Sequence, residues 1–252
     1  MKKHSLFREF LILQRSIPGI VTALFVVAII SMNLLANKSI SLPVSWLALD
    51  CGFIFSWLVF LLMDIVTKRF GPKAATLLSV LALIANLFVA LMLFIGAKIP
   101  GVWGESFVEG SELVINTALN NTFAGTWYVL MGSSVAFIVS ALVNNYLNAA
   151  IGRKAKKDSF GTFALRSYVS TFIGQFTDNL LFALIVSLHF FGWSLLQCFT
   201  SAVTGAIAEL FCEVLFSPLG YRIVRRWEKE GIGEEYLRYR GEIPDGSAAG
   251  SI

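Results

Sequence analysis

Long apolar stretches recur along the whole 252-residue chain, and they constrain its fold more than any other feature. Six of them reach or approach the ~20 residues that an α-helix needs to cross a hydrocarbon layer of ~30 Å. Hydrophobic residues make up 56% of the chain and charged residues only 14%. The sequence therefore predicts an all-α integral membrane protein with six transmembrane helices in one bundle, at 19–37, 48–67, 74–96, 126–149, 165–189 and 194–216.

The six spans predict one membrane domain over residues 1–240, followed by a disordered tail over 241–252 that is rich in glycine, alanine and serine. Within that domain, 221–240 mixes arginine, glutamate and aromatic residues at helical spacing, which predicts a helix outside the bilayer. The long connection 97–125 is either a surface helix capped by Ser111 or a solvated loop.

Lysine and arginine are distributed very unequally between the two sides of this topology. If the chain crosses the bilayer at each span, 18 of its 20 basic residues fall on the side of the N-terminus and C-terminus. The positive-inside rule then predicts cytoplasmic termini in a cell inner (plasma) membrane. The net charge of +4 follows from this asymmetry facing an anionic lipid bilayer, so no nucleic-acid partner is expected.

Four carboxylates lie within the apolar spans: Asp64, Asp178, Glu209 and Glu213. The loop-by-loop count places no lysine or arginine beside them inside the bilayer. An intramembrane acid without a partner costs roughly 3 kcal/mol or more, so such residues are expected to face the bundle interior and to have a function.

The fifth span carries a polar face, because Thr171, Gln175 and Asp178 recur at three- and four-residue steps, with Asn179 beside them. Twelve residues separate Asp178 from Arg166, which places the carboxylate ~18 Å deep and near the midplane. This face indicates a binding site, or alternatively a hydrogen-bonded clasp between helices.

The sixth span repeats the pattern, since Ser201, Gly205, Glu209 and Glu213 follow one another at steps of four. Two carboxylates one helical turn apart repel each other, so Glu209 and Glu213 could share a proton. Glu213 lies near the end of the span and could instead extend to the interface. The small residues of this stripe suit internal packing or a homodimer seam equally well.

Asp64 ends the second span, where it could pair with Lys68 at four-residue spacing. Alternatively it turns inward beside an aromatic stripe that offers a stacking surface for a flat ring, formed by Phe53, Trp57 and Phe60. Buried amides complete the set. The candidate substrate-binding residues are Asp178, Glu209, Asp64, Gln175, Asn179, Glu213, Asn33 and Asn86.

Acids and amides without a buried base disfavour an anionic ligand and favour a cationic amine or a ring with adjacent N–H donors. A transporter of divalent cations is an alternative, because such cations prefer oxygen ligands. A hydrolase is disfavoured, since the two histidines, His4 and His189, lie apart and neither H-E-x-x-H nor G-x-S-x-G occurs. No cofactor is expected. A structural assembly protein remains a further alternative, in which amides could replace the acids.

Three segments carry a resemblance to a known family. The runs MDIVTKRFG at 63–71 and STFIGQFTD at 170–178, together with Glu213 and SPLGY at 217–221, resemble the vitamin uptake transporter family, whose named members are queuosine-precursor transporters. Asn33 is similar as well, and the likeness spans about 31–236. Asn179 departs from it, because a small hydroxyl residue is expected there.

The resemblance implies an importer of 7-deazaguanine compounds such as preQ0, preQ1 or queuine, with a six-helix fold similar to the substrate-binding subunits of energy-coupling-factor transporters. Its carboxylates would accept hydrogen bonds from the guanine-like edge. The chain has no G-x-x-x-x-G-K-[ST] run, so ATP hydrolysis within it is excluded. Energy would come from a separate ATPase module, from an ion gradient such as that of protons, or from downstream consumption of the substrate.

Overall fold

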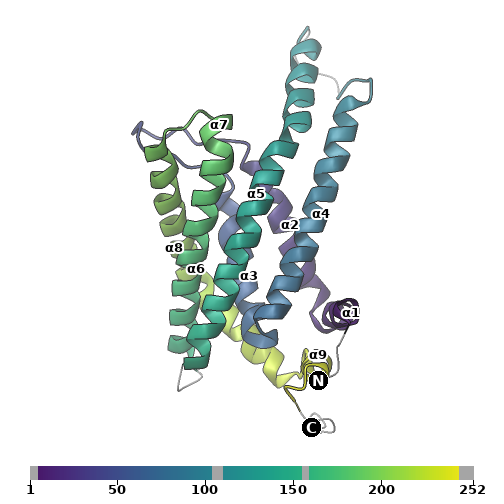
Figure 1. Ribbon diagram of the computed structural model, residues 1–252, viewed down its shortest axis with the longest axis vertical. Coiled ribbons are helices and arrows are strands. Elements are labelled where there is room, and N and C mark those ends of the chain that lie inside the picture. Colours follow the sequence, from purple (N-terminus) through teal and green to yellow (C-terminus); the bar gives the residue numbers. More distant parts are fainter. Residues whose placement is uncertain (1–4, 104–109, 155–158, 244–252) are drawn as a thin grey trace.

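The computed structural model describes residues 5–103, 110–154 and 159–243, which form a bundle of long helices (Figure 1). Its helices, in chain order, are α1 (Leu6–Ser16), α2 (Gly19–Leu35), α3 (Phe53–Phe70), α4 (Pro72–Lys98), α5 (Glu112–Lys154), α6 (Phe160–Phe182), the π-helical turn η1 (Ala183–Ser187), α7 (Leu188–Phe190), α8 (Leu195–Lys229) and α9 (Glu234–Tyr239). The fold is all-helical over the described residues, apart from one isolated β-bridge between Ser39 and Asp50.

Each of the six predicted spans coincides with a helix, namely α2, α3, α4, α5, α6 continued through η1 and α7, and α8. Four of these are long and apolar enough to cross a membrane, and the bent pair α1–α2 would make a fifth. The remaining helix, α3, has 18 residues and carries three charged side chains, Asp64, Lys68 and Arg69. The all-helical membrane fold is therefore supported, while the count of six spans remains a prediction.

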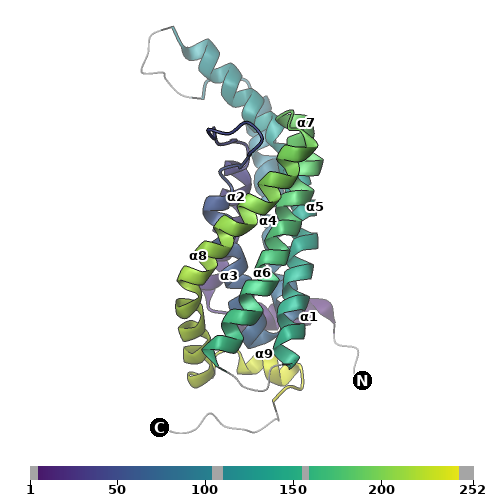
Figure 2. The same cartoon turned by 90° about the vertical axis from the view of Figure 1, so that its left-hand side faces the viewer.

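Two helices extend well beyond their predicted spans. α5 has 43 residues and is ~65 Å long, about twice the hydrocarbon thickness. Residues 112–125 therefore continue the helix of the fourth span and form neither a separate surface helix nor a solvated loop. With α4 it projects past the rest of the bundle (Figures 1 and 2). α8 runs through Pro218 to Lys229, so the predicted helix at 221–240 consists of the end of α8 and the short α9. Most of the predicted tail, 244–252, lies outside the described residues.

α3 lies at the centre of the bundle, where it contacts α2, α4, α5, α6 and α8. All residues from Val59 to Thr67 are buried within the protein. α8 crosses the bundle obliquely and packs on α3 and α6 (Figure 2). This arrangement brings polar residues of α3, α6 and α8 together inside the protein, far from the lipid-facing surface.

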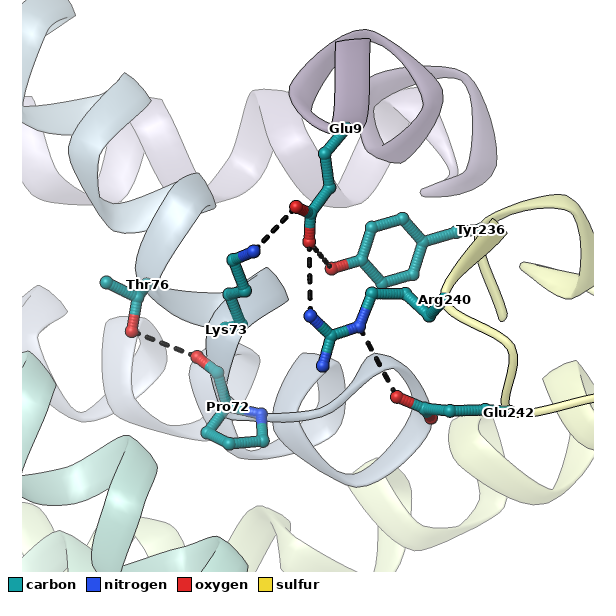
Figure 3. Close-up of polar contacts among 7 residues, drawn as sticks. All are labelled: Glu9, Pro72, Lys73, Thr76, Tyr236, Arg240 and Glu242. Atoms are coloured by element: carbon teal, nitrogen blue, oxygen red, sulfur yellow. Dashed lines mark hydrogen bonds and ion pairs between the residues drawn. The ribbon is translucent and has the colours of Figure 1, made fainter. Parts of the chain in front are cut away.

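Glu9 joins three distant segments at the end of the bundle where α1 and α9 lie (Figures 1 and 3). Its carboxylate accepts hydrogen bonds from Lys73 Nζ at 2.6 Å, Tyr236 Oη at 3.2 Å and Arg240 Nη1 at 3.3 Å. α1 meets α2 at an angle of 106° and exposes Leu6 and Phe7. Glu9 therefore fixes an amphipathic helix across the base of the bundle.

Replacing Glu9 by glutamine is expected to lower the free energy of unfolding by roughly 1–3 kcal/mol, because charge-assisted hydrogen bonds are lost. Burial by itself raises the pKa of Glu9, but the hydrogen bond and charge of Lys73, the Tyr236 hydroxyl and Arg240 together lower that pKa below its ordinary value of 4.5. The contribution is therefore complete above pH 4.5 and is lost as the pH falls through the lower folded-state pKa. Thermal unfolding at several pH values measures this effect, and Glu235→Gln, an exposed acid on α9, is the control.

Candidate functional site

A small polar cavity lies beneath the connection between α2 and α3. It is lined by Met32, Asn33, Ala36, Asp50, Gly52, Phe53, Ser56, Ser133, Asp178, Asn179, Phe182 and Glu209. These residues come from α2, α3, α5, α6, α8 and the connection itself, rather than from the second, fifth and sixth spans alone. The cavity volume is about 20 Å³, room for one water molecule, so a bicyclic ligand requires the lining side chains to separate.

Three carboxylates face this cavity: Asp50, Asp178 and Glu209. Glu209 is held by the hydroxyl of Ser56 and, at 3.5 Å, by Asn179 Nδ2. Asp178 Oδ1 accepts a hydrogen bond from Ser140 Oγ at 2.8 Å. No lining residue carries a positive charge. The cavity therefore favours a ligand that is cationic or donates hydrogen bonds.

Asn33 supplies the opposite polarity at the same place. Its Oδ1 accepts a hydrogen bond from the hydroxyl of Ser133, while its Nδ2 is buried without a partner among the described residues. A free amide N–H in a carboxylate-lined cavity can donate to a carbonyl oxygen of a ligand. The cavity thus combines several carboxylate acceptors with an amide donor that has no partner among the described residues.

Asp64 and Glu213 lie apart from the cavity, in a second buried cluster. Asp64 turns inward and is fully buried, accepting hydrogen bonds from Asn144 Nδ2 at 3.0 Å, Thr171 Oγ1 at 3.3 Å and the hydroxyl of Ser167. Ser167 Oγ also lies 2.6 Å from Glu213 Oε1. Glu213 is fully buried and does not extend to the interface.

The predicted pairing of Glu209 with Glu213 is replaced by two separate sites. Both residues lie on the buried side of α8, but Glu209 contacts Ser56 and Asn179, whereas Glu213 contacts Ser167. Both acids face α3 and α6, but they lie one turn or ~6 Å apart along α8 and so meet different residues of these two helices. The site around Ser167, whose hydroxyl contacts both Asp64 and Glu213, is called the carboxylate bridge below.

Arg166 contradicts the expectation that the intramembrane acids lack a basic neighbour. Its side chain is only 7% exposed, and its Nε donates a hydrogen bond to Asn148 Oδ1 at 2.7 Å. Its positive charge acts favourably on the Asp64 carboxylate. The loop-by-loop count assigns Arg166 to the connection before the fifth span, because Arg166 lies at the very start of that span. It belongs to the polar interior near the carboxylate bridge but does not line the cavity.

The remaining predicted site residues occupy two different places. Gln175 is fully buried on α6, between Thr171 and Asp178 on one helix face, and neither of its amide atoms has a partner among the described residues. It therefore lies between the bridge and the cavity. Asn86 is buried on α4 with both amide atoms unpaired, but it lines neither site.

The predicted aromatic stripe on α3 is divided among three environments. Phe53 lines the cavity, Trp57 stacks on Phe216 with ring centroids 4.5 Å apart, and Phe60 is buried in the core. Phe182 of α6 supplies a second ring at the cavity instead. The stripe as a whole is therefore no stacking platform.

Several cavity residues had not been identified from the sequence. Asp50 lies near the start of the predicted second span, 48–67, but was not among the acids singled out there; in the structure it belongs to the connection between α2 and α3. It accepts a hydrogen bond from the Gly52 amide at 2.7 Å. A Cβ at Gly52 would lie 2.7 Å from Asp50 Oδ1 and 3.0 Å from the Met32 carbonyl oxygen, so a larger residue would displace the Asp50 carboxylate. Ser56 and Ser133 carry no distinctive pattern, since serine is frequent throughout the spans.

Substituting alanine for Gly205 is expected to weaken ligand binding about threefold to tenfold with little loss of stability. The new Cβ would lie 2.5 Å from Asn179 Nδ2, so Asn179 must rotate away from Glu209, at the cost of about one hydrogen bond. The displaced atom ends a side chain, so the backbone can remain in place. Titration of a ligand into both proteins measures the change, with Ser201→Ala, one turn earlier, as control. Unchanged affinity would show that Asn179 does not position Glu209.

Comparison with known protein families gives a match. A family model described as "Putative vitamin uptake transporter" matches residues 50–223, more than two thirds of the chain. The chain belongs to this family. The matched region contains both members of the Asp64–Glu213 pair and every cavity residue except those at the end of α2. No curated protein and no solved structure matches the chain.

Membership in a transporter family agrees with the apolar helices and makes this a membrane protein with an uptake role. Within residues 5–103, 110–154 and 159–243, no three histidine, cysteine, aspartate or glutamate side chains come together closely enough to hold a metal ion.

Proposed function

We propose that this protein imports a 7-deazaguanine base, such as preQ0, preQ1 or queuine, across a cell inner membrane. One observation carries the proposal: three carboxylates and the free Nδ2 of Asn33 surround the same cavity. A guanine-like edge presents adjacent N–H donors beside a carbonyl oxygen. Asp178 or Glu209 would accept from the donors, and Asn33 would donate to the carbonyl.

The transport cycle we propose uses six spans with cytoplasmic termini. The one-sided distribution of lysine and arginine supports this orientation. α3 would be the span most shielded from lipid, which explains how it tolerates its charged residues. Because the cavity has room for about one water molecule, the ligand would enter only after α3, α6 and α8 move apart.

Thermal unfolding of the detergent-purified protein tests the substrate class. The panel comprises preQ1, preQ0, queuine, guanine, biotin, thiamin and divalent cations. A ligand that binds only the folded state adds roughly 2.7 kcal/mol of stability at ~100 times its dissociation constant. We expect stabilisation by the deazapurines, with preQ1 exceeding preQ0 because its aminomethyl group is a cation among three carboxylates.

Each other outcome excludes a defined alternative. Stabilisation by thiamin or biotin alone would retain vitamin uptake and reject the deazapurine. Stabilisation by metal ions alone would favour the transport of divalent cations, for which the carboxylates are the supporting observation. Uptake of radiolabelled preQ1 by cells that express the chain, compared with cells that do not, then separates a transporter from a binding protein.

A further inference from the structure

The carboxylate bridge has too few hydrogen atoms for its contacts. Ser167 Oγ lies within hydrogen-bond distance of both Asp64 Oδ2 and Glu213 Oε1, yet a hydroxyl group has only one hydrogen to donate. With both acids ionised, one of these close oxygen pairs would have no hydrogen between its atoms. A further proton on one of the two carboxylates satisfies both contacts.

The neighbours of the bridge indicate which acid carries that proton. Asp64 accepts hydrogen bonds from Asn144 and Thr171 and is favoured by the charge of Arg166, all of which suit an ionised carboxylate. Glu213 has only Ser167, and its Oε2 is fully buried without a partner among the described residues. A buried ionised oxygen in that position would be very costly, whereas a protonated acid is tolerated.

A second unpaired acceptor lies at the same place. Asn144 donates its Nδ2 to Asp64, while its Oδ1 has no partner in the described part of the chain. Asn144 is fully buried, so bulk water does not reach this oxygen to donate a hydrogen bond. Glu213 Oε2 and Asn144 Oδ1 are thus two buried acceptors without a donor in this region, and a proton on Glu213 removes the negative charge from the first of them.

We propose that the carboxylate bridge is the proton site that couples this transporter to a proton gradient. The inference rests on the proposed uptake function. When Glu213 is protonated, it donates a hydrogen bond to Ser167 Oγ, and the Ser167 hydroxyl donates a hydrogen bond to Asp64 Oδ2. When the proton leaves to water at the α1–α9 end of the bundle, two carboxylates face one hydroxyl and repel each other.

The bridge and the cavity share the same three helices, which gives the coupling a physical route. α3 carries Ser56 and Asp64, eight residues or ~12 Å apart, and α8 carries Glu209 and Glu213, one turn apart. α6 carries Ser167 and the cavity residue Asp178. Repulsion between Asp64 and Glu213 would separate α3 from α8, and the same movement would part Ser56 from Glu209.

Other charged or titratable groups near the bridge are few. α6 contributes Arg166 and also Tyr168, whose hydroxyl bonds to Ser217 at 2.8 Å. α8 contributes Glu209, one turn away at the cavity, and α5 contributes the neutral amide of Asn144. Asp64 accepts hydrogen bonds from three side chains and Glu213 from one, which leaves Glu213 as the group that exchanges a proton.

Transport into proteoliposomes tests the coupling. We expect preQ1 uptake by the native protein to rise at least severalfold with an inward proton gradient and not with a sodium gradient. Glu213→Gln copies the protonated acid, so it is expected to fold, bind preQ1 and exchange internal for external preQ1, but to lose the response to the gradient. Glu228→Gln on the same helix is the matched control, and it should keep that response.

A ligand-independent measurement keeps the test decisive. The infrared spectrum should contain the C=O band of a buried carboxylic acid at neutral pH, absent from Glu213→Gln and shifted in Ser167→Ala. Native uptake that ignores the proton gradient, or that follows sodium, would overturn the proposal, as would an unchanged band in Glu213→Gln. If no deazapurine stabilises the protein although the band behaves as expected, the substrate assignment fails while the proton site stands.

Discussion

Replacing Asp178 by asparagine is expected to weaken the binding of preQ1 about 30-fold to 1000-fold, equivalent to ~2–4 kcal/mol, while the fold is retained. Asparagine can still accept the hydrogen bond that Ser140 Oγ gives to Oδ1. It cannot present two acceptors to adjacent N–H groups, and it removes one of the three negative charges around the cavity. The loss should therefore appear in affinity rather than in stability.

Isothermal titration of preQ1 into both purified proteins measures this change. Asn86→Ala is the control, because Asn86 is equally buried but lines no part of the cavity. It should alter the unfolding temperature and leave the affinity unchanged. Equal affinity of the native and Asp178→Asn proteins would remove Asp178 from the binding site.

Replacing Arg166 by glutamine is expected to cost about 3–5 kcal/mol of stability, the largest structural effect that we predict for a single substitution. The guanidinium is buried, is bonded to Asn148 and compensates the charge of Asp64. Its removal leaves an ionised carboxylate without a counter-charge in a region of low dielectric constant. Low yield and a strongly reduced unfolding temperature are the expected observations.

A double-mutant cycle shows whether the effect of Arg166 operates through Asp64. In the Asp64→Asn background, Arg166→Gln should cost at least 1 kcal/mol less, because no uncompensated charge remains. Arg153→Gln, which changes an exposed basic residue near the end of α5, controls for the general loss of positive charge. Strictly additive costs would show that the two groups do not interact.

The positions of the six predicted helices could be read from apolar length, whereas the amphipathic α1 carries no such signal and was missed. The full lengths of α5 and α8 could not be predicted. Hydropathy detects only the apolar part of a helix, whereas both helices continue through polar residues beyond it. The same limitation explains Arg166. Its place at the start of an apolar run did not reveal whether the side chain faces water or the interior.

The site was predictable in its chemistry more than in its grouping. Four acids in a bilayer indicated a polar interior, and Asp178, Asn179, Glu209 and Asn33 do meet at one cavity. Whether Glu209 and Glu213 act together depends on which side chains of α3 and α6 lie opposite each of them, which residue spacing along one helix does not contain. The serines that donate hydrogen bonds to the carboxylates could not be predicted, because a serine is identified as functional only by its partner in the folded structure.

In the proposed cycle, α8 would convert events in the interior into movement at the aqueous surface. It is one unbroken helix through Glu213 and Pro218 to Lys229, and the turn after it is tied to α3 by Arg69 Nε, 2.8 Å from the Ile232 carbonyl oxygen. From Glu213 to Lys229 the helix measures ~24 Å, so a tilt of ~10° displaces its end by ~4 Å. A fluorescent probe attached there would report each cycle of the transporter in real time, without any label on the substrate.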